Sequence, residues 1–514
     1  MLRRSLLGAA TLAWTLPRVS RAATQDGLVF SWPANAGPLD PHGYGPNQMY
    51  AQAMLYEPLV RYGASGGIES CLATAWTSDD DGRAWTFALR PGVRFSDGTV
   101  FDAAAAKANI DALLAHRDRH GWLELAARLE AAEAPDPATL RLRLNQPYAP
   151  ILFDLSLIRP FRFASPAVLR PEGGVSTPVG TGPWRLAETR RSEQDVFLRR
   201  EDYWGEKPAL RQVVVKVVSD ANTRALALET GEIDLAYGAD QLDADTFRRF
   251  AGDGRFVTAV SPPMATRMLA IHSGQAPTDD LAVRRAIHQG IDREALVRHV
   301  LQGTEPVATS LFAAGMPDLP PLPFDPMAAR RVLEQAGWLL PPGDRVRRKQ
   351  AAALALDLCF AGGDALQKAL AEAIQSDLSR IGIAARLLGE DAATLQGRQR
   401  SGDFGLVFTE TWGPPYDPHA FLGAMRAPSH ADFQAQSGLP MKDEIDRRIT
   451  ALLAATDAAA READESWVLT TLHEQAVYFP ISFLTNKLVH RKGFGDVPFG
   501  GTFDEIPFSR IRRA

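Results

Sequence analysis

Residues 411–430 read TWGPPYDPHAFLGAMRAPSH, and the rest of the chain can be interpreted outward from this stretch. It follows the apolar run 404–408, which we expect to form a buried strand. Prolines stiffen its first half, at positions 414, 415 and 418. Trp412 and Tyr416 add aromatic faces, and a rigid aromatic loop after a strand is typical of a small-molecule site. Packing of the two rings against the scaffold of a surface loop would account for the same pattern.

The composition is that of a soluble globular protein with a large core. Hydrophobic residues make up 46% and charged residues 23% of the 514 residues. A prior of about 150 residues per domain indicates about three domains or two large lobes. The net charge is −5 and no stretch carries a dense Lys/Arg run, which argues against a nucleic-acid binder. Cys71 and Cys359 form no CxxC pair; a disulfide would need an oxidising compartment, and two buried thiols are favoured.

The N-terminus has the pattern of a targeting segment. Arg3 and Arg4 precede an apolar run at 6–16, and Ser20-Arg21-Ala22 supplies small residues for a cleavage site. We therefore expect residues 1–22 to be a signal peptide and the mature chain to be exported, most simply to the periplasm. The adjacent arginines also allow a twin-arginine export route. No other apolar stretch is long enough to span a bilayer.

Local patterns predict a mixed α/β fold. Alternating apolar residues at 354–360 indicate a strand, Asp364 is placed to cap a helix that runs to Arg380, and 383–388 indicates the next strand. This order is a βαβ unit. Asp102 is expected to cap an Ala-rich helix that ends near Leu114. Thr278 is expected to cap another, with apolar residues at helical spacing up to Val300.

Several long motifs, taken in order, resemble the peptide and nickel class of solute-binding proteins of ABC importers. These motifs are ATAWTSDDDGRAWTFALRPGVRFSDGTVFDA, TPVGTGPWRL, EDYWGEKPALRQVVVKVV, TRALALETGEIDLA, AVRRAIHQGIDREALV and AVYFPISFLTNKLV. Four more are similar to the nickel-binding proteins of nickel importers within that class: WPANAGPLDPHGYGPNQMYAQAMLYEPLV, RHGWLELA, RPFRF and TWGPPYDPHAFLGAMRAPSHADFQAQ. The resemblance covers essentially the whole mature chain.

This resemblance implies a two-lobe solute-binding fold of type II, in which hinge strands join two mixed α/β lobes. We expect lobe I at 23–267, including an extra subdomain, lobe II at 268–483, and a return to lobe I at 484–514. The hinges are placed near residues 267–272 and 480–484.

Motifs of enzymes are not found in the sequence. It contains no HExxH, P-loop or GxGxxG pattern, and His473-Glu474 lacks the second histidine of a metalloprotease. Gly180-Thr181-Gly182-Pro183 resembles a structural turn of the family and is interpreted as backbone geometry. We therefore expect a binding protein without a catalytic cofactor, although a periplasmic hydrolase built from scattered residues is an alternative.

The ten histidines do not cluster, which argues against a cage of many imidazoles. His116 and His120 have the i, i+4 spacing of a metal pair, but their charged neighbours favour a solvated helix face. A nickel binder with few imidazoles can take the metal inside a small chelator. It then needs cations for the chelator's carboxylates, aromatic rings for its hydrocarbon and one imidazole for an open metal position.

The resemblance supplies residues for each of these parts. Arg159 matches the arginine that pairs with the chelator's carboxylates, and His430 matches the histidine that reaches the metal. Further residues match the lining and the aromatic walls of the pocket, namely Tyr44, Met49, Arg119, Trp122, Trp412 and Tyr416. Two positions depart from the relatives. Gln396 replaces a pocket tyrosine, and Pro415 replaces the aspartate with which peptide-binding relatives hold an amino terminus.

The sequence therefore predicts a monomeric periplasmic receptor. It would capture a nickel chelate between two lobes and deliver it to a membrane permease driven by an ATPase. A receptor for dipeptides, haem or another metallophore is an alternative within the same class. A third alternative is a sensor that hands its ligand-closed form to a chemoreceptor.

Overall fold

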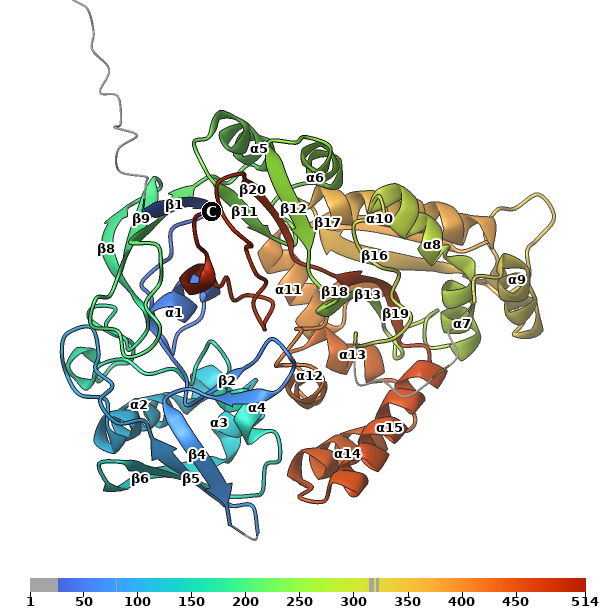
Figure 1. Ribbon diagram of the computed structural model, residues 1–514. Coiled ribbons are helices and arrows are strands. Elements are labelled where there is room, and N and C mark those ends of the chain that lie inside the picture. The colour runs from blue at the N-terminus through green and yellow to red at the C-terminus, as the bar shows by residue number, and fades with distance from the viewer. Residues whose placement is uncertain (1–25, 80, 314–318, 320–322) are drawn as a thin grey trace, which may run out of the picture.

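The computed structural model describes residues 26–79, 81–313, 319 and 323–514 (Figure 1). The predicted signal peptide lies outside these residues. Two large sheets organise the chain, and a smaller sheet lies beside them. Among the described residues, no helix is both long and apolar enough to cross a membrane.

The first large sheet has seven strands, and the two ends of the described chain meet in it. Strand β1 pairs in parallel with β10 and β11, and the other neighbours are antiparallel. In sheet order the strands are β12 (Phe256–Val260), β20 (Lys487–Arg491), β11 (Leu235–Gly238), β1 (Gly27–Trp32), β10 (Gln212–Val217), β9 (Gln194–Arg199) and β8 (Trp184–Arg190). The helices α1 (Met49–Leu55), α5 (Ala221–Thr230) and α6 (Ala244–Ala251) lie on this side of the molecule (Figure 1).

The second large sheet has five strands and contains the predicted βαβ unit. In sheet order the strands are β17 (Ala384–Glu390), β16 (Ala355–Ala361), β18 (Leu406–Glu410), β13 (Ala265–Ile271) and β19 (Tyr478–Leu484). Strands β16 and β17 are parallel and are joined by α10 (Ala365–Arg380). The Asp364 side chain accepts from Leu366 N and Gln367 N at 2.9 and 3.0 Å, as predicted for a cap. The expected strand at 404–408 is present but begins two residues later, in β18.

The third sheet has four strands and is covered by α2 (Ala103–Ala115). In sheet order its strands are β4 (Ala73–Ser78), β5 (Ala84–Leu89), β7 (Thr139–Leu144) and β6 (Leu129–Asp136). Asp102 caps α2 by accepting from Ala105 N at 2.9 Å, which confirms the predicted cap.

The remaining elements are short strands and helices. Two hairpins pair β2 (Val60–Tyr62) with β3 (Ile68–Ser70) and β14 (Arg348–Lys349) with β15 (Ala352–Ala353). The helices are α3 (Glu124–Arg128), α4 (Ile151–Leu155), α7 (Leu281–Gly290), α8 (Arg293–Ala295), α9 (Pro326–Gln335), α11 (Ala392–Ser401), α12 (His419–Ala424), α13 (Ala431–Gln436), α14 (Lys442–Ala454) and α15 (Ala458–Glu474). Single turns are η2 (Arg117–His120), η3 (Pro166–Val168), η4 (Leu296–Val300) and η5 (Phe508–Arg510).

The chain passes between the two large sheets at two places, from β12 to β13 and from β19 to β20 (Figure 1). Strands β13 and β19 are antiparallel neighbours in the five-stranded sheet, whereas β12 and β20 are antiparallel neighbours in the seven-stranded one. The predicted hinge segments fall within or beside β13 and β19. Their action as hinges remains a prediction.

A buried ion network lies at these crossings. The Arg267 side chain is 2% exposed, with Nη1 3.1 Å from Glu410 and Nη2 3.5 Å from Glu305 and 3.7 Å from Asp240. Lys487 Nζ lies 3.6 Å from the same Glu305 oxygen. Because β13, β18, β11 and β20 all contribute residues in or next to the network, it connects the two large sheets.

The predicted helix capped by Thr278 is wrong in two respects. The helix begins at Leu281, and its cap is Asp280, which accepts from Ala282 N at 2.9 Å. Thr278 instead donates its hydroxyl to Gln275 O. The helix also ends at Gly290, because Ile291 is extended and Asp292 caps the new turn of α8 and η4. Two successive helical segments can keep the same apolar spacing as one.

Two local predictions are confirmed. Cys71 and Cys359 are free and buried, and burial raises the pKa of each thiol to about 12. The turn at 180–183 owes its glycines to close backbone packing. A Cβ atom at Gly180 would lie 2.0 Å from Leu55 O, and one at Gly182 would lie 2.5 Å from Met54 O.

Candidate functional site

A cavity of about 560 Å³ lies where the three sheets approach one another. All eight residues predicted for the site line it, and they come from segments that are far apart in sequence. The full lining is Tyr44, Met49, Arg119, Trp122, Arg159, Ala265, Glu410, Thr411, Trp412, Tyr416, His430, Leu484, Phe503 and Asp504.

The loop that follows β18 is held in a fixed shape by Asp417. Its carboxylate accepts from Trp412 N at 3.1 Å and from Gly413 N at 2.8 Å. Gly413 has a φ of +71°, a conformation that favours glycine. Thr411 N donates to Thr266 O and its hydroxyl accepts from Thr266 N, which fastens the loop to β13. The aromatic side chains of the loop therefore project from a rigid base.

The aromatic rings meet across the cavity. Trp412 packs edge-on against Trp122 with ring centroids 5.6 Å apart, and against Tyr416 at 6.0 Å. Trp122 also lies 6.2 Å from Tyr416. Trp122 belongs to the segment between η2 and α3, whereas Trp412 and Tyr416 follow the five-stranded sheet. Ring contacts thus join two parts of the chain over the cavity.

His120 is a residue of this region that the sequence reasoning missed. It was expected on a solvated helix face with His116, but α2 ends before both residues and η2 turns His120 inward, where it is 1% exposed. Its Nδ1 lies 2.8 Å from the Tyr44 hydroxyl oxygen, which also accepts from Trp122 Nε1 at 2.7 Å. Burial lowers the pKa of His120 to about 4 and raises that of Tyr44 to about 12, so both are neutral at pH 7.

Two arginines contribute positive charge to the cavity. The Arg159 guanidinium lies over the Tyr44 ring at 5.3 Å and donates to Asn47 O at 3.4 Å. Arg119 donates to Glu172 O at 3.2 Å and is exposed. Neither forms an ion pair with any residue that the structure describes. A guanidinium without a carboxylate partner can receive one from a ligand.

Two carboxyl groups in the lining were also missed. Asp504 faces the cavity without a hydrogen bond to a described residue, and burial raises its pKa to about 6 against the opposing effect of Arg159. Glu410 is paired with Arg267, yet burial raises its pKa to about 7. No local sequence pattern marks either residue, because both reach the cavity only through long-range packing.

His430 is the one imidazole among the lining residues. It is the residue before α13, its side chain makes no capping hydrogen bond, and its ring lies 5.9 Å from that of Trp412. Burial lowers its pKa. A neutral imidazole has a lone pair for a metal ion. Among the described residues, no group of three or more His, Cys, Asp or Glu side chains is arranged to hold a metal.

Two positions that depart from the relatives do not line the cavity. Gln396 is exposed on α11, and Pro415 is buried in the loop between Trp412 and Tyr416.

The fold and the family model together define the class of the protein. The family model described as "Bacterial extracellular solute-binding proteins, family 5 Middle" matches residues 67–433, and the chain belongs to this family. This is a family of solute-binding proteins and not of enzymes, and the predicted mixed α/β solute-binding fold is confirmed.

The similarity is high to proteins described as nickel-binding. The chain is 46% identical over 502 residues to the nickel-binding periplasmic protein of Escherichia coli strain K12, covering 96% of each chain. A crystal structure of NikA from Brucella suis in complex with Fe(III)-EDTA is 48% identical with a TM-score of 0.93, covering 95% of this chain and 100% of that one. NikZ from Campylobacter jejuni in complex with Ni(L-His), at 20% identity and a TM-score of 0.78, covers 94% and 98% and shows the shared fold.

Proposed function

We propose that the protein is the periplasmic receptor of an ABC importer and binds nickel as a complex with a small organic chelator. The Escherichia coli relative is named as a nickel-binding periplasmic protein, and the Brucella relative holds a metal chelate. The observation that carries the proposal is the set of side chains that line the cavity. It combines two arginines without an ion pair to a described residue, walls of aromatic rings and a single imidazole.

Each part has a separate task in this proposal. Arg159 pairs with a free carboxylate of the chelator, because its planar fork matches a carboxylate. Trp122, Trp412 and Tyr416 cover the hydrocarbon of the chelator. His430 donates its lone pair to a metal position that the chelator leaves open. Tyr44, Met49 and Arg119 complete the wall. The nickel ion is cargo, and no catalytic cofactor is assigned.

We assign the chain to two lobes with the boundaries expected from the sequence. Lobe I takes 23–267 and 484–514 and contains the seven-stranded sheet and, as a subdomain, the four-stranded sheet. Lobe II takes 268–483 and contains most of the five-stranded sheet. The cavity would then lie between the lobes, and motion at β13 and β19 would open it. The contact of Trp122 with Trp412 supports a closed arrangement of the lobes.

The proposed setting follows from the family and the N-terminal pattern. The chain would be exported with removal of residues 1–22 and would act in the periplasm as a monomer. Its partners would be the transmembrane subunits of a permease and their cytoplasmic ATPase. Mass spectrometry of the exported protein should find a mature N-terminus near Ala23, and a protein that still begins at Met1 would refute this step.

Calorimetry tests the chelate proposal. Nickel alone should bind weakly, and histidine or a polycarboxylate chelator should tighten binding by orders of magnitude, because the cavity offers one imidazole to a bare ion. Equal affinity for bare and chelated nickel would contradict the proposal. Titration with dipeptides and with haem separates the alternatives, since tight binding of either without nickel would assign the protein to that ligand.

A further inference from the structure

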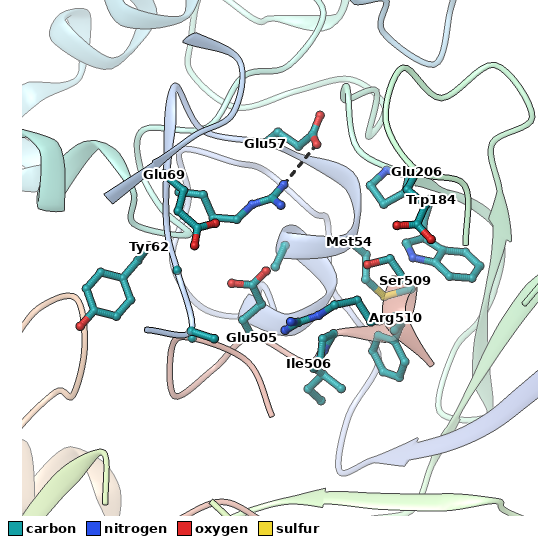
Figure 2. A pocket seen from close by; sticks show the side chains of 18 of the residues that line it. Met54, Glu57, Tyr62, Glu69, Trp184, Glu206, Glu505, Ile506, Ser509 and Arg510 are labelled. Carbon is teal, nitrogen blue, oxygen red and sulfur yellow. Dashed lines mark ion pairs between the residues drawn. The ribbon is translucent and has the colours of Figure 1, made fainter. Parts of the chain in front are cut away.

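A second cavity of about 510 Å³ is enclosed by chain segments that neighbour those lining the first one, and Figure 2 shows it from close by. It is enclosed by α1, the β2–β3 hairpin, the start of β8 and the C-terminal segment. We call it the rear cavity. Its lining is Ala53, Met54, Glu57, Arg61, Tyr62, Gly63, Ala64, Glu69, Arg162, Pro183, Trp184, Tyr203, Glu206, Gly501, Glu505, Ile506, Pro507, Phe508, Ser509, Arg510 and Arg512.

The lining combines an apolar floor with charges of both signs. Met54, Trp184, Ile506 and Phe508 are buried and supply the apolar surface. Among the charged lining residues are equal numbers of glutamates and arginines. The rear cavity therefore offers neither a purely acidic nor a purely basic environment.

Several of these charges are already satisfied within the protein. Glu57 is 2% exposed and accepts from the Tyr203 hydroxyl at 2.7 Å and from Trp204 Nε1 at 2.8 Å, and Arg61 lies 3.5 Å from it. Figure 2 shows the Arg61–Glu57 ion pair as a dashed line. Glu206 pairs with Arg512 at the rim. These groups hold the walls together.

Four of the charged lining residues form no ion pair with a described residue: Glu69 and Arg510, which are exposed, and Arg162 and Glu505. Arg162 is 4% exposed and donates to Tyr56 O at 2.8 Å and Leu157 O at 3.2 Å, but no carboxylate lies within 4.0 Å of it. Glu505 makes no hydrogen bond or ion pair with a described residue, and Figure 2 shows its carboxylate directed into the rear cavity. Glu505 is half-buried and is the carboxylate that acts most strongly on Arg162, so the two opposite charges face the same space without a direct ion pair. The buried Arg162 guanidinium therefore favours a ligand carboxylate, and the Glu505 carboxylate favours a ligand cation.

We infer that the rear cavity is a second binding site for a small zwitterion with an apolar side chain, of the class of the free α-amino acids. The ligand carboxylate binds at Arg162, its ammonium group binds at Glu505, and its side chain lies on the floor of Trp184 and Phe508. An anion alone would be repelled by Glu505, and a cation alone would be repelled by Arg162. A zwitterion satisfies both.

The rear cavity and the first cavity share their dividing wall. Helix α1 presents Met49 to the first cavity and Met54 to the rear cavity. In the same way, Arg159 lines the first cavity and Arg162 lines the rear one. In the C-terminal segment, Asp504 lines the first cavity and Glu505, the next residue, lines the rear one. This wall provides neighbouring residues with which the two sites can be tested separately.

Calorimetry on the metal-free full-length mature protein tests the assignment with L-leucine as the probe. Two matched analogues each lack one charge: 4-methylpentanoate has no ammonium and 3-methylbutylamine has no carboxylate. L-Leucine should bind saturably, and each analogue should bind about tenfold or more weakly, as expected for loss of a charge-assisted contact. Absence of saturable L-leucine binding would overturn the inference.

Variants locate the binding. Glu505→Gln should weaken L-leucine binding by about tenfold and leave nickel-chelate binding unchanged. Arg159→Ala should weaken nickel-chelate binding and leave L-leucine binding unchanged. Glu206→Gln, at the rim, is the matched control and should change neither. L-Leucine binding that is lost in Arg159→Ala and kept in Glu505→Gln would assign it to the first cavity and overturn the inference. Chelate binding is recorded separately, so failure of the proposed function does not affect this result.

Discussion

The two cavities differ in which parts of the chain build them. The first takes residues from three strands of the five-stranded sheet, from the loop after β18 and from segments at 44–49, 119–159 and 503–504. The rear cavity takes all of its residues from 53–206 and 501–512. A movement between the two large sheets would therefore change the first cavity and leave the rear one intact. Closure of the sheets around a ligand can be linked only to the first.

The cavities also differ in the treatment of charge. In the first, Arg159 and Asp504 face the open space and lack ion pairs within 4.0 Å. In the rear cavity four of the eight charged side chains form ion pairs, Glu69 and Arg510 are exposed, and Arg162 and Glu505 face the enclosed space. The largest mutational effects are therefore expected in the first cavity.

Arg159→Ala should produce the largest change. Removing one partner of a desolvated charge pair costs about 2–5 kcal/mol, so affinity for a carboxylate chelate should fall by about two decades or more. Arg159→Lys should recover only part, because an ammonium group cannot reproduce the fork. Titration with nickel–histidine measures both. A loss below threefold would show that the carboxylate is held elsewhere.

Trp412→Ala should have the next largest effect. It removes ring contacts with Trp122, Tyr416 and His430, and such aromatic pairs contribute about 0.5–1.5 kcal/mol each beyond burial. We expect chelate affinity to fall by about tenfold or more, with little change in L-leucine binding. Trp412→Phe is the conservative control and should keep most of the affinity. Equal losses for both ligands would indicate general unfolding, which a thermal melt would detect.

His430→Ala should weaken only chelates that leave a metal position open, by about tenfold at pH 7. Burial lowers the pKa of His430, so the neutral, metal-binding form persists below the ordinary value of about 6.5. The contribution of His430 should therefore be constant from neutral pH down past about 6.5 and fade only below it, whereas that of Arg159 should not fade. Titration with an open and a saturated nickel chelate at several pH values separates the contributions of His430 and Arg159. If His430→Ala weakens both chelates equally at every pH, His430 is part of the cavity wall and not a metal ligand.

Asp504→Asn should have the smallest effect and the opposite sign. The pKa of Asp504 is raised to about 6, so it is ionised at pH 7.5 and repels a free carboxylate of the chelate. The variant should bind polycarboxylate chelates a few-fold more tightly at pH 7.5 and equally at pH 5. Glu505→Gln removes the neighbouring charge on the other side of the wall and is the matched control, with no expected effect on the chelate.

The same variant has a predicted effect on stability. A carboxyl group whose pKa is raised in the folded state stabilises the fold below its unfolded pKa, and this stabilisation is lost as pH rises through about 6. Asp504→Asn should therefore raise the melting temperature relative to wild type at pH 7.5 but not at pH 4. A lower melting temperature at pH 7.5 would show that the Asp504 charge stabilises the fold through Arg159.

Elements with strong local signals could be predicted from the sequence. Strand β16, helix α10 and strand β17 follow from alternation, a cap at Asp364 and helical spacing, all read within a few residues. The helix after Thr278 shows the limit of the same reasoning. Thr278 and Asp280 are both suitable caps, and helical spacing up to Val300 did not reveal the break at Ile291, where Asp292 caps a new turn.

Some residues of the candidate site could likewise be predicted from the sequence, and others could not. Eight of its residues lie in motifs shared with known proteins, and the structure brings all eight to one cavity. Asp504 and Glu410 lie outside these motifs, whereas His120 lies within RHGWLELA but was expected on a solvated face. Their positions depend on the return of the C-terminal segment, on the ion network of Arg267 and on the turn η2. The charged neighbours of His120 indicated exposure, because a sequence pattern cannot show that the helix stops before it.

Strand β20 has a consequence for the order in which the protein folds. It lies between β11 and β12, so the seven-stranded sheet is continuous only after residues 487–491 have joined it. Strand β11 ends at Gly238, and the residues of the second large sheet are synthesised before β20 follows. Pairing over such a separation is slow, because the entropy of closing the loop is lost before the contacts form. The seven-stranded sheet is thus expected to be completed late, after the second large sheet has been made and the C-terminal segment has returned.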